Sequence, residues 1–291
     1  MFGKFKLFKR LLGKMSIFYE NANYYGVDIA NTTVGYYWEK QLKERLESPE
    51  CLEQYGYKVF SQNDEDGIIA EIFRRIGTTN KLFVEFGVGE GLECNSHYLL
   101  HLGWKGLWIE GDPRPYKNIS TNFKNLTTKE TLKIVNDYVT VDNINDILIE
   151  NNIEGNIDLL SIDIDGNDYH IFEAITCIDP RVIIIEYNAK FPPDCDWVMP
   201  YDETYIWDGS DKQGASLSAL TKLANRKGYQ LIGTNYNGVN AFYVRLDLIK
   251  DKMFASPARP EKLYNPRRQN ICYKSTLPSR EYLVSADIDA F

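Results

Sequence analysis

The stretch FVEFGVGEGLECN, residues 83–95, indicates the fold of this chain. Its first four residues suit a buried strand, and glycines then occupy alternate positions, Gly87, Gly89 and Gly91. An acid, Glu85, precedes the first glycine by two residues. A glycine-rich turn directly after a strand lets the backbone approach a nucleotide-like ligand closely in α/β folds. The stretch therefore predicts a ligand site at the end of the first strand.

The spacing of these residues narrows the choice of ligand. A dinucleotide-binding turn reads G-x-G-x-x-G and directs a helix N-terminus at the pyrophosphate. Here the pattern is acid-x-G-x-G-x-G, and an acid at the strand end would repel a phosphate. A ligand with a cationic head and a ribose, such as S-adenosylmethionine, suits this charge better. We therefore expect S-adenosylmethionine as the cofactor.

Composition limits the class of protein. The chain has 291 residues, 44% of them hydrophobic, and a formal net charge of −8. An acidic chain is a poor general nucleic-acid binder, because binding to phosphates needs a basic surface. Its five cysteines are scattered without C-x-x-C spacing, which favours reduced thiols in a cytosolic protein. No apolar run approaches the roughly 18 residues of a spanning helix, so a cytoplasmic protein is expected.

The N-terminal segment departs from the acidic balance. Residues 1–18 contain five Lys and Arg side chains and no acid, and apolar residues lie between them at helical spacing. Such a basic amphipathic helix could lie on an anionic membrane surface at its cytosolic face. A solvated helix that contacts no lipid is the alternative.

Seven short apolar runs predict a sheet. They are Leu82–Phe86, Leu107–Ile109, Leu132–Val135, Ile157–Ile162, Val182–Ile185, Gln230–Ile232 and Ala241–Val244. Helix-length stretches separate the first five, which indicates a parallel sheet with helices on both faces. The turn pair Asn237-Gly238 joins the last two runs as an antiparallel hairpin. We expect an N-terminal helical extension (1–56), a Rossmann-like domain (57–250) and a C-terminal extension (251–291) that packs on the domain.

Acids or amides follow each of the first five strands. They are Glu85, then Glu110 and Asp112, then Asn136 and Asp137, then Asp163, Asp165 and Asp168, then Glu186 and Asn188. In open α/β sheets, ligands bind beyond the carboxyl ends of the strands, so we expect these side chains to surround one crevice. Glu110 is placed to bind ribose hydroxyls, and Asp137 to meet an adenine amino group. Asp168 is expected to act as the N-cap of the next helix.

Long segments of the chain resemble the FkbM-like family of S-adenosylmethionine-dependent methyltransferases, over roughly residues 57–245. The resemblance rests on FSQNDEDGI (60–68), FVEFGVGEGLECNSHYLL (83–100), GWKGLWIEGDP (103–113), IDLLSIDIDGNDY (157–169), IIIEYNAKFPP (183–193), GASLSALTKLANRKGY (214–229) and GVNAFYVR (238–245). The family's motif after the fourth strand, Asp-x-Glu-Gly, matches Asp163 to Gly166 with Asp165 in place of Glu. The resemblance implies methyl transfer, often to a hydroxyl group of a sugar or polyketide-like acceptor. It also implies cofactor binding by Glu85, the three glycines and Glu110.

Methyl transfer from a sulfonium is an in-line displacement, to which orientation of the reactants can contribute about 7–11 kcal/mol. A hydroxyl acceptor must also lose its proton, and Asp163 is the first candidate to take it, with Asp165 and Glu186 beside it. Oxygen ligands at the same place could instead hold Mg²⁺, with Asp163, Glu186 and Asn188 as the candidate ligands.

The segment Phe191–Ser216 is expected to form a lid or an acceptor pocket, because long loops in compact domains are usually functional or disordered. Asn188, Tyr201, Trp207 and Asp208 are the candidate acceptor contacts, for a sugar or a surface-glycan or glycolipid precursor. Aromatic loop packing is the alternative.

Three residues upstream, Gln62, Glu65 and Asp66, are expected to close over the cofactor or simply to begin a helix. His97 and His101 are expected to pack rather than to bind zinc, because no glutamate follows His97 as in H-E-x-x-H. Two other functions remain open at this point. One is a catalytically silent interaction protein with the same fold, and the other is a nicotinamide-linked oxidoreductase.

Overall fold

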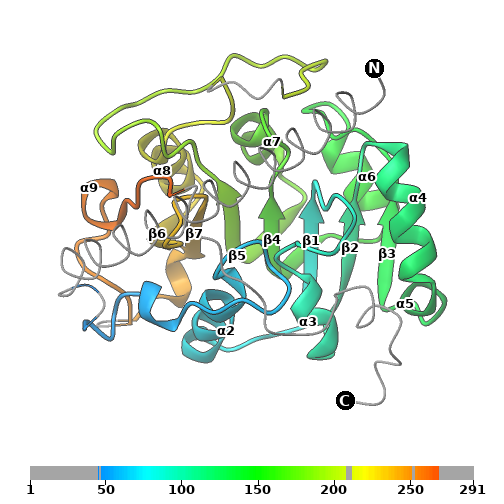
Figure 1. Ribbon diagram of the computed structural model, residues 1–291, viewed down its shortest axis with the longest axis horizontal. Coiled ribbons are helices and arrows are strands. Elements are labelled where there is room, and N and C mark those ends of the chain that lie inside the picture. The colour runs from blue at the N-terminus through cyan, green and yellow to red at the C-terminus, as the bar shows by residue number, and fades with distance from the viewer. Residues whose placement is uncertain (1–44, 46, 208–211, 251–252, 269–291) are drawn as a thin grey trace, which may run out of the picture.

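A seven-stranded sheet forms the centre of the computed structural model, which describes residues 45, 47–207, 212–250 and 253–268 (Figure 1). Its strands are β1 (Leu82–Phe86), β2 (Lys105–Ile109), β3 (Leu132–Val135), β4 (Gly155–Ile162), β5 (Ile178–Glu186), β6 (Tyr229–Thr234) and β7 (Asn240–Arg245). They lie in the order β3-β2-β1-β4-β5-β7-β6. The first five are parallel, and β7 is antiparallel to both β5 and β6. The predicted Rossmann-like sheet with a C-terminal hairpin is therefore confirmed.

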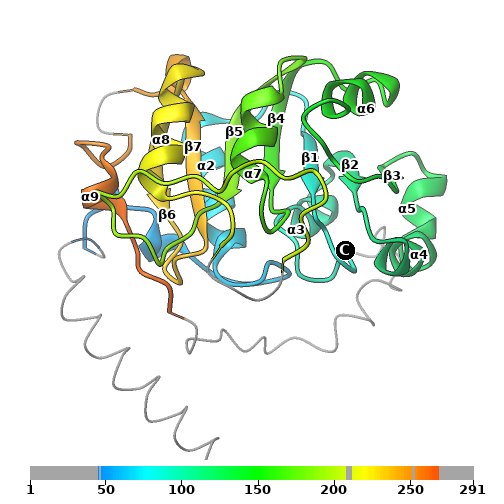
Figure 2. The same cartoon turned by 90° about the horizontal axis from the view of Figure 1, so that it is seen from above.

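Helices cover both faces of the sheet (Figure 2). The α-helices are α2 (Glu65–Ile76), α3 (His97–His101), α4 (Pro113–Asn122), α5 (Lys124–Thr128), α6 (Ile144–Glu150), α7 (Asp168–Ala174), α8 (Leu217–Arg226) and α9 (Pro260–Leu263), and two short 3₁₀ helices are η1 (Glu53–Tyr55) and η2 (Leu246–Leu248). Apolar residues of α6, α7 and α8 form one core with the sheet, and those of α2, α3, α4 and α5 form the other. This burial on both sides explains why the central strands are continuous apolar runs.

The carboxyl ends of the strands are aligned, and this alignment positions the site. The last residues of β1, β2 and β4 are direct neighbours in the sheet, and β4 is in register with β5 in the same way. The next position along each strand therefore forms one row across the sheet. Glu110, Gly87, Asp163, Glu186 and Asn240 occupy this row, and Asn240 lies directly opposite Glu186. Side chains in one row of a sheet point to the same face.

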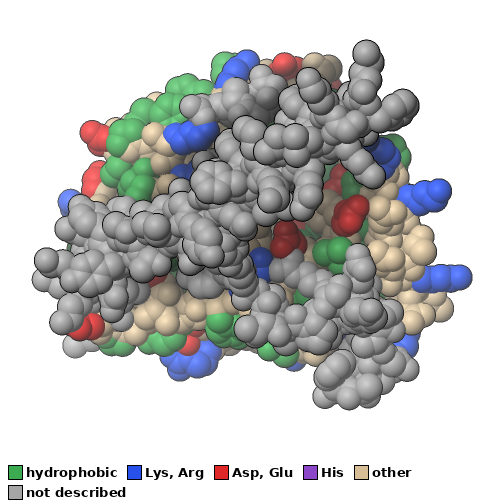
Figure 3. All heavy atoms as spheres, viewed as in Figure 1, with side chains coloured by type: hydrophobic (Ala, Val, Ile, Leu, Met, Phe, Trp, Pro, Cys, Tyr) green, Lys and Arg blue, Asp and Glu red, His purple; other side chains and the backbone are tan. Residues whose placement is uncertain are grey.

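Several expectations fall on residues outside the described part of the chain. The basic segment 1–18 and Asp208 are among them, and so is most of the C-terminal extension. None of the described helices is long and apolar enough to cross a membrane. On the face shown in Figure 3, the visible Lys and Arg side chains are scattered singly around the outline. The expected boundaries of the extensions remain predictions.

Candidate active site

The glycine loop (residues 87–91) lies directly against the loop that follows β4. Gly87 has a φ of 70°, and its N–H donates to the Ile109 carbonyl at 3.1 Å. A Cβ on Gly87 would stand 1.7 Å from the carbonyl oxygen of Asp163. Only glycine fits there, because the two backbones are in contact at this point. The predicted cofactor loop and the first candidate catalytic residue are therefore adjacent.

Gly89, at the tip of this loop, serves a different purpose. Its φ is 55°, and no heavy atom lies within 4 Å of the place where a Cβ would stand. Its N–H donates to a carboxylate oxygen of Glu110 at 2.8 Å, and the N–H of Asp112 donates to the other oxygen at the same distance. Burial raises the pKa of Glu110, and these hydrogen bonds oppose that rise. Glu110 thus joins the glycine loop to the end of β2.

Glu85 is buried near the end of β1 and binds the segment that follows the glycine loop. Its carboxylate accepts from the backbone N–H groups of Asn95 and Ser96 at 2.8 and 2.9 Å. It also accepts from the hydroxyl of Ser96 and, at 3.2 Å, from that of Ser161. Burial raises its pKa, against the effect of these donors. With four donors engaged, Glu85 fixes the segment after the glycine loop against β4.

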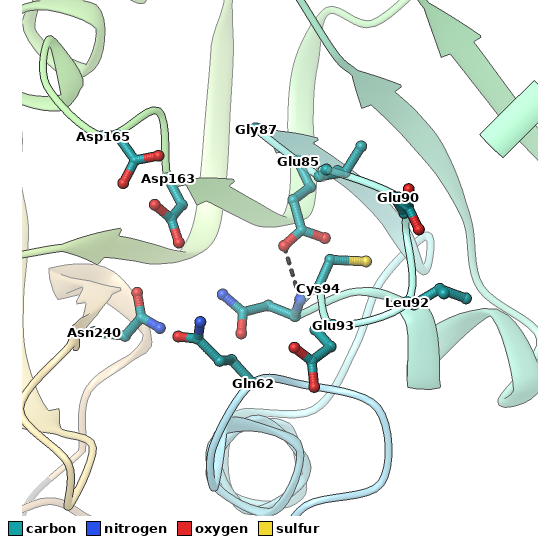
Figure 4. A pocket seen from close by; sticks show the side chains of 13 residues that line it. Gln62, Glu85, Gly87, Glu90, Leu92, Glu93, Cys94, Asp163, Asp165 and Asn240 are labelled. Carbon is teal, nitrogen blue, oxygen red and sulfur yellow. Dashed lines mark hydrogen bonds between the residues drawn. The ribbon is translucent and has the colours of Figure 1, made fainter. Parts of the chain in front are cut away.

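A cavity of about 510 Å³ opens between the glycine loop and β4 (Figure 4). Glu85, Gly87 and Gly89 line one side, and Asp163 and Asp165 line the other. Its remaining lining residues are Gln62, Val88, Glu90, Leu92, Glu93, Cys94, Asn95 and Asn240. Five of the predicted site residues therefore line one cavity. The described site residues that lie outside its lining are Gly91, Glu110, Asp112, Asp137, Glu186, Asn188, Tyr201 and Trp207. Gly91 instead packs its backbone on Trp108 and Phe123.

The end of β2 and the end of β3 differ from expectation in detail. Asp112 caps α4, since its side chain accepts from the N–H of Arg114 at 2.8 Å. Asp137 is exposed, while the neighbouring amide of Asn136 donates to the Glu110 carbonyl at 2.7 Å. The sequence analysis missed Tyr138, whose ring fills the space over Gly111 and is 60% exposed. An exposed aromatic ring in this place offers a flat surface to an adenine.

Three carboxylates converge at the ends of β4 and β5. Asp163, Asp165 and Glu186, the acid cluster, each place an oxygen within 4.8 Å of the others. Burial first, and the charge of Glu186 second, raise the pKa of Asp163 well above its usual value. Burial, and then the charges of Asp168 and Asp165, raise the pKa of Glu186 to about 8. The cluster therefore holds protons more tightly than exposed carboxylates do.

The acid cluster has few hydrogen-bond donors. Among the described residues, only the Gln213 amide donates to Glu186, at 3.3 Å, and no hydrogen bond reaches the carboxylates of Asp163 or Asp165. One cation does act on the cluster: the charge of Arg267 lowers the pKa of both Asp165 and Glu186. Arg267 follows α9, far along the chain, and no sequence motif links it to this cluster.

Two residues near the cluster have other tasks. The prediction that Asp168 is the N-cap of α7 is wrong. Asn167 holds that position, and Asp168 is the first helical residue. The Asp168 carboxylate accepts from the N–H groups of Ile164 and Gly166, both at 2.9 Å, and so shapes the loop after β4. Asn188 is buried, accepting from the N–H of Lys190 and donating to the Gln213 carbonyl.

The described part of the long loop (191–216) covers the loop after β4. The backbone of Asp202 exchanges hydrogen bonds with the amide of Asn167, and the ring of Tyr205 lies over Gly166. Tyr201 packs edge-on against His170 and is 37% exposed. Trp207 is 40% exposed. This loop is therefore well placed to contact an acceptor that reaches the acid cluster.

The residues before α2 close the other side of the cavity. One oxygen of Asp66 accepts from the N–H groups of three consecutive residues, Val59 to Ser61, at 2.7 to 2.9 Å. This turn carries Gln62 to the cavity, while Glu65 accepts from the amides of Asn235 and Asn240.

The histidines of α3 pack, as expected. The rings of His97 and His101 both stack on Phe60, with centroids 3.9 and 5.0 Å away.

The strand order, the antiparallel last strand and the glycine loop at the end of β1 together define a Rossmann-like methyltransferase fold. The family model for the methyltransferase FkbM domain matches residues 68–230, which is more than half of the chain. The chain therefore belongs to the FkbM methyltransferase family and is an S-adenosylmethionine-dependent methyltransferase. The family predicted from the sequence motifs is confirmed.

Solved structures with similarity to this chain include two methyltransferases. One is the glycopeptide N-methyltransferase MtfA complexed with sinefungin, at 11% identity and a TM-score of 0.39, with 61% of this chain and 85% of that chain covered. The other is an S-adenosylmethionine-dependent methyltransferase from Clostridium acetobutylicum, at 9% identity and a TM-score of 0.40, with 74% and 99% covered. A search of the curated proteins finds no match to this chain.

Proposed function

We propose that this methyltransferase transfers the methyl group to a hydroxyl of a sugar, as part of a surface glycan or glycolipid precursor. The observation that carries the proposal is the acid cluster beside the glycine loop. Hydroxyl acceptors need a proton acceptor, because the oxygen must lose its proton when it gains the methyl group. The three carboxylates of the acid cluster meet that need. They accept few hydrogen bonds from the protein and lie where the sulfonium end of the cofactor would be.

The placement of the cofactor follows from the glycine loop. The open space beside Gly89 would leave room for the cofactor along this loop, while Gly87 lets the loop lie against Asp163. We expect Glu110, at the end of β2, to accept from the ribose hydroxyls with the lone pairs that Gly89 and Asp112 leave free, and Tyr138 to stack on a face of the adenine. Because Gly87 touches the backbone of Asp163, the sulfonium end of a cofactor on the loop would face the acid cluster.

The chemistry balances with Asp163 as the base. The acceptor oxygen attacks the methyl carbon, the carbon–sulfur bond breaks, and its electron pair neutralises the sulfonium to give S-adenosylhomocysteine. The acceptor proton moves to the Asp163 carboxylate. A raised pKa makes that carboxylate a stronger base than an exposed one, provided that it is ionised when the acceptor binds. Glu186 and Asp165 would accept hydrogen bonds from neighbouring hydroxyls.

The surroundings of the cluster favour a sugar-like acceptor. Sugars present several hydroxyls on one edge and aliphatic C–H groups on their faces. The carboxylates would accept from the hydroxyls, and the rings of Tyr201, Tyr205 and Trp207 would pack on the C–H faces. For a lipid-linked precursor, the basic segment 1–18 would contact the cytosolic face of the membrane, where its charges are attracted to anionic lipid.

The test is an acceptor screen with S-adenosylmethionine. Purified protein would be incubated with free sugars, nucleotide sugars, lipid-linked saccharides and amino sugars, and products would be analysed by mass spectrometry and then by fragmentation. The proposal expects the mass of one methyl group added at a hydroxyl. Methylation of the amine in the amino sugars alone would overturn the assignment to oxygen. Calorimetric binding of S-adenosylhomocysteine without any product in the whole screen would favour a silent interaction protein.

We also propose that Mg²⁺ binds at the acid cluster, with ligands that differ from the set predicted from the sequence. The carbonyl oxygen of Asn188 already accepts from Lys190, and its amide group donates to Gln213. An oxygen of Asp165, not of Asn188, converges with those of Asp163 and Glu186.

A further inference from the structure

Asn240 lies next to the acid cluster because of the strand register. Asp163 directly follows β4, Glu186 ends β5, and Asn240 begins β7 opposite Glu186. The three side chains therefore stand side by side in one row, on the same face of the sheet. Figure 4 shows Asp163 and Asn240 directed into the same space, although they are 77 positions apart in the sequence.

The side-chain oxygen of Asn240 has no hydrogen-bond partner in the described structure. Asn240 is only 3% exposed, and its amide nitrogen donates to Glu65 at 3.0 Å. The oxygen Oδ1 is buried without a donor. Gln213 repeats this arrangement, since its nitrogen faces Glu186 while its oxygen Oε1 is buried without a donor. Buried polar atoms are nearly always paired, so an unpaired oxygen beside three carboxylates indicates a missing positive partner.

We propose that Asp163, Asp165, Glu186 and the Oδ1 atom of Asn240 form a binding site for a hard divalent cation such as Mg²⁺. All four groups offer oxygen, and the carboxylate oxygens lie within 4.8 Å of one another. Mg²⁺ and Mn²⁺ prefer carboxylate and carbonyl oxygens, together with water. A cation explains both features at once: it neutralises the clustered carboxylates, and it gives the amide oxygen a partner. This inference rests on the proposed methyl transfer to a hydroxyl.

The cation would supply charge that lowers the pKa of an acceptor hydroxyl bound beside it. The protein's own groups have separate tasks. The three carboxylates would hold the cation through one oxygen each, and the second oxygen of Asp163 would receive the proton of the acceptor. Gln213 acts as a positioning residue, because its amide orients the Glu186 carboxylate. Arg267 adds a further positive charge near Asp165 and Glu186.

The experiment measures cation binding directly, without cofactor or acceptor. Mg²⁺ and then Mn²⁺ would be titrated into the full chain by calorimetry, and thermal unfolding would be followed with each ion and with EDTA. We expect saturable binding of one ion and a higher Tm in its presence. Removing one carboxylate by Glu186→Gln should raise the Tm in EDTA, because repulsion is relieved, and should weaken ion binding at least tenfold.

Two further variants sharpen the test. Asn240→Asp adds a carboxylate to the row, so it should lower the Tm in EDTA and tighten ion binding. Glu150→Gln, which removes an exposed acid on α6, is the matched control and should bind the ion like the unchanged protein. No ion binding by the unchanged protein would overturn the proposal, as would equal binding by Glu186→Gln. Methyl transfer that persists in EDTA would overturn the cation's role and leave the proposed function standing.

Discussion

The two halves of the carboxyl edge treat their acids in opposite ways. At β1 and β2, the buried carboxylates of Glu85 and Glu110 accept from backbone N–H groups of the loops around them. At β4 and β5, the described structure offers no donor to Asp163 and only the Gln213 amide to Glu186. An acid that accepts several backbone hydrogen bonds fixes the protein's own loops. An acid left without donors is available to a ligand.

This difference has an energetic basis. A buried carboxylate without donors is costly, and it persists only where function requires it or where a proton or cation accompanies it. A carboxylate with several donors is stable, and its loss leaves those donors unpaired. Substitutions in the two halves should therefore affect different measurements.

The largest expected effect is on turnover, through Asp163→Asn. An amide cannot accept the acceptor proton, so kcat should fall by about 10²–10⁴-fold. Because no donor is lost, the free energy of unfolding should stay equal or rise. Steady-state kinetics and urea unfolding measure the two quantities. An unchanged kcat would show that Asp163 is not the base. A strong loss of stability would show that Asp163, like the acids at β1 and β2, stabilises the fold.

Gly87→Ala should cost stability, by about 3 kcal/mol. Its Cβ would stand 1.7 Å from a backbone oxygen, and its φ is 70°, so both crowding and the left-handed conformation contribute. Gly103→Ala is the matched control, with a φ of 76° and open space, and should cost about 1 kcal/mol. Urea unfolding compares them, and equal losses would show that the contact with Asp163 is not rigid.

Glu85→Gln tests the acids at β1 and β2, which accept backbone hydrogen bonds. The new NH₂ group would face donors instead of accepting from them, so the free energy of unfolding should fall by about 2 kcal/mol. Affinity for S-adenosylhomocysteine should fall with it, since the glycine loop loses its anchor. Calorimetry and urea unfolding report both. A loss of affinity without any loss of stability would mean that Glu85 contacts the cofactor itself.

Asp64 has only one of its two oxygens paired, and its contribution to stability depends on pH. One oxygen accepts from the N–H of Tyr236 at 3.2 Å, while the other is buried without a partner. Burial, and then the charge of Glu65, raise its pKa from 3.8 to about 7. Between these values the folded state holds a proton that the unfolded state releases, so the free energy of unfolding falls as pH rises.

The variant Asp64→Asn has no such proton. From about pH 4 to pH 8, the unchanged protein should lose roughly 4 kcal/mol of stability relative to this variant. The quantity to measure is the difference between their urea midpoints at each pH. A constant difference would show that Asp64 titrates normally in the folded protein.

Tyr138→Ala should have the smallest effect. If the exposed ring stacks on the adenine, its loss should weaken S-adenosylhomocysteine binding by about 1 kcal/mol, or several-fold. Tyr57→Ala removes an exposed ring elsewhere and serves as control. Equal affinity of both variants would place the adenine away from the end of β3.

The sequence predicted the sheet well, for a physical reason. Strands buried on both faces must be apolar throughout, so their positions stand out, and acids directly after them fall on one edge. What it could not provide was pairing between distant segments. Asn240 meets Glu186 only through the register of β7, and Arg267 arrives from beyond α9. The cap role assigned to Asp168 failed because several polar residues precede α7, and the neighbouring Asn167 holds that position.

The contact between Gly87 and Asp163 has a consequence for how this enzyme could change its substrate. The distance between the glycine loop and the loop after β4 is set by a contact between their backbones, not by side chains. Substitutions in the long loop (191–216) could therefore alter which acceptor is admitted without disturbing the alignment of the reacting atoms. An engineer who wishes to redirect this enzyme should exchange that loop first and leave the glycine unchanged.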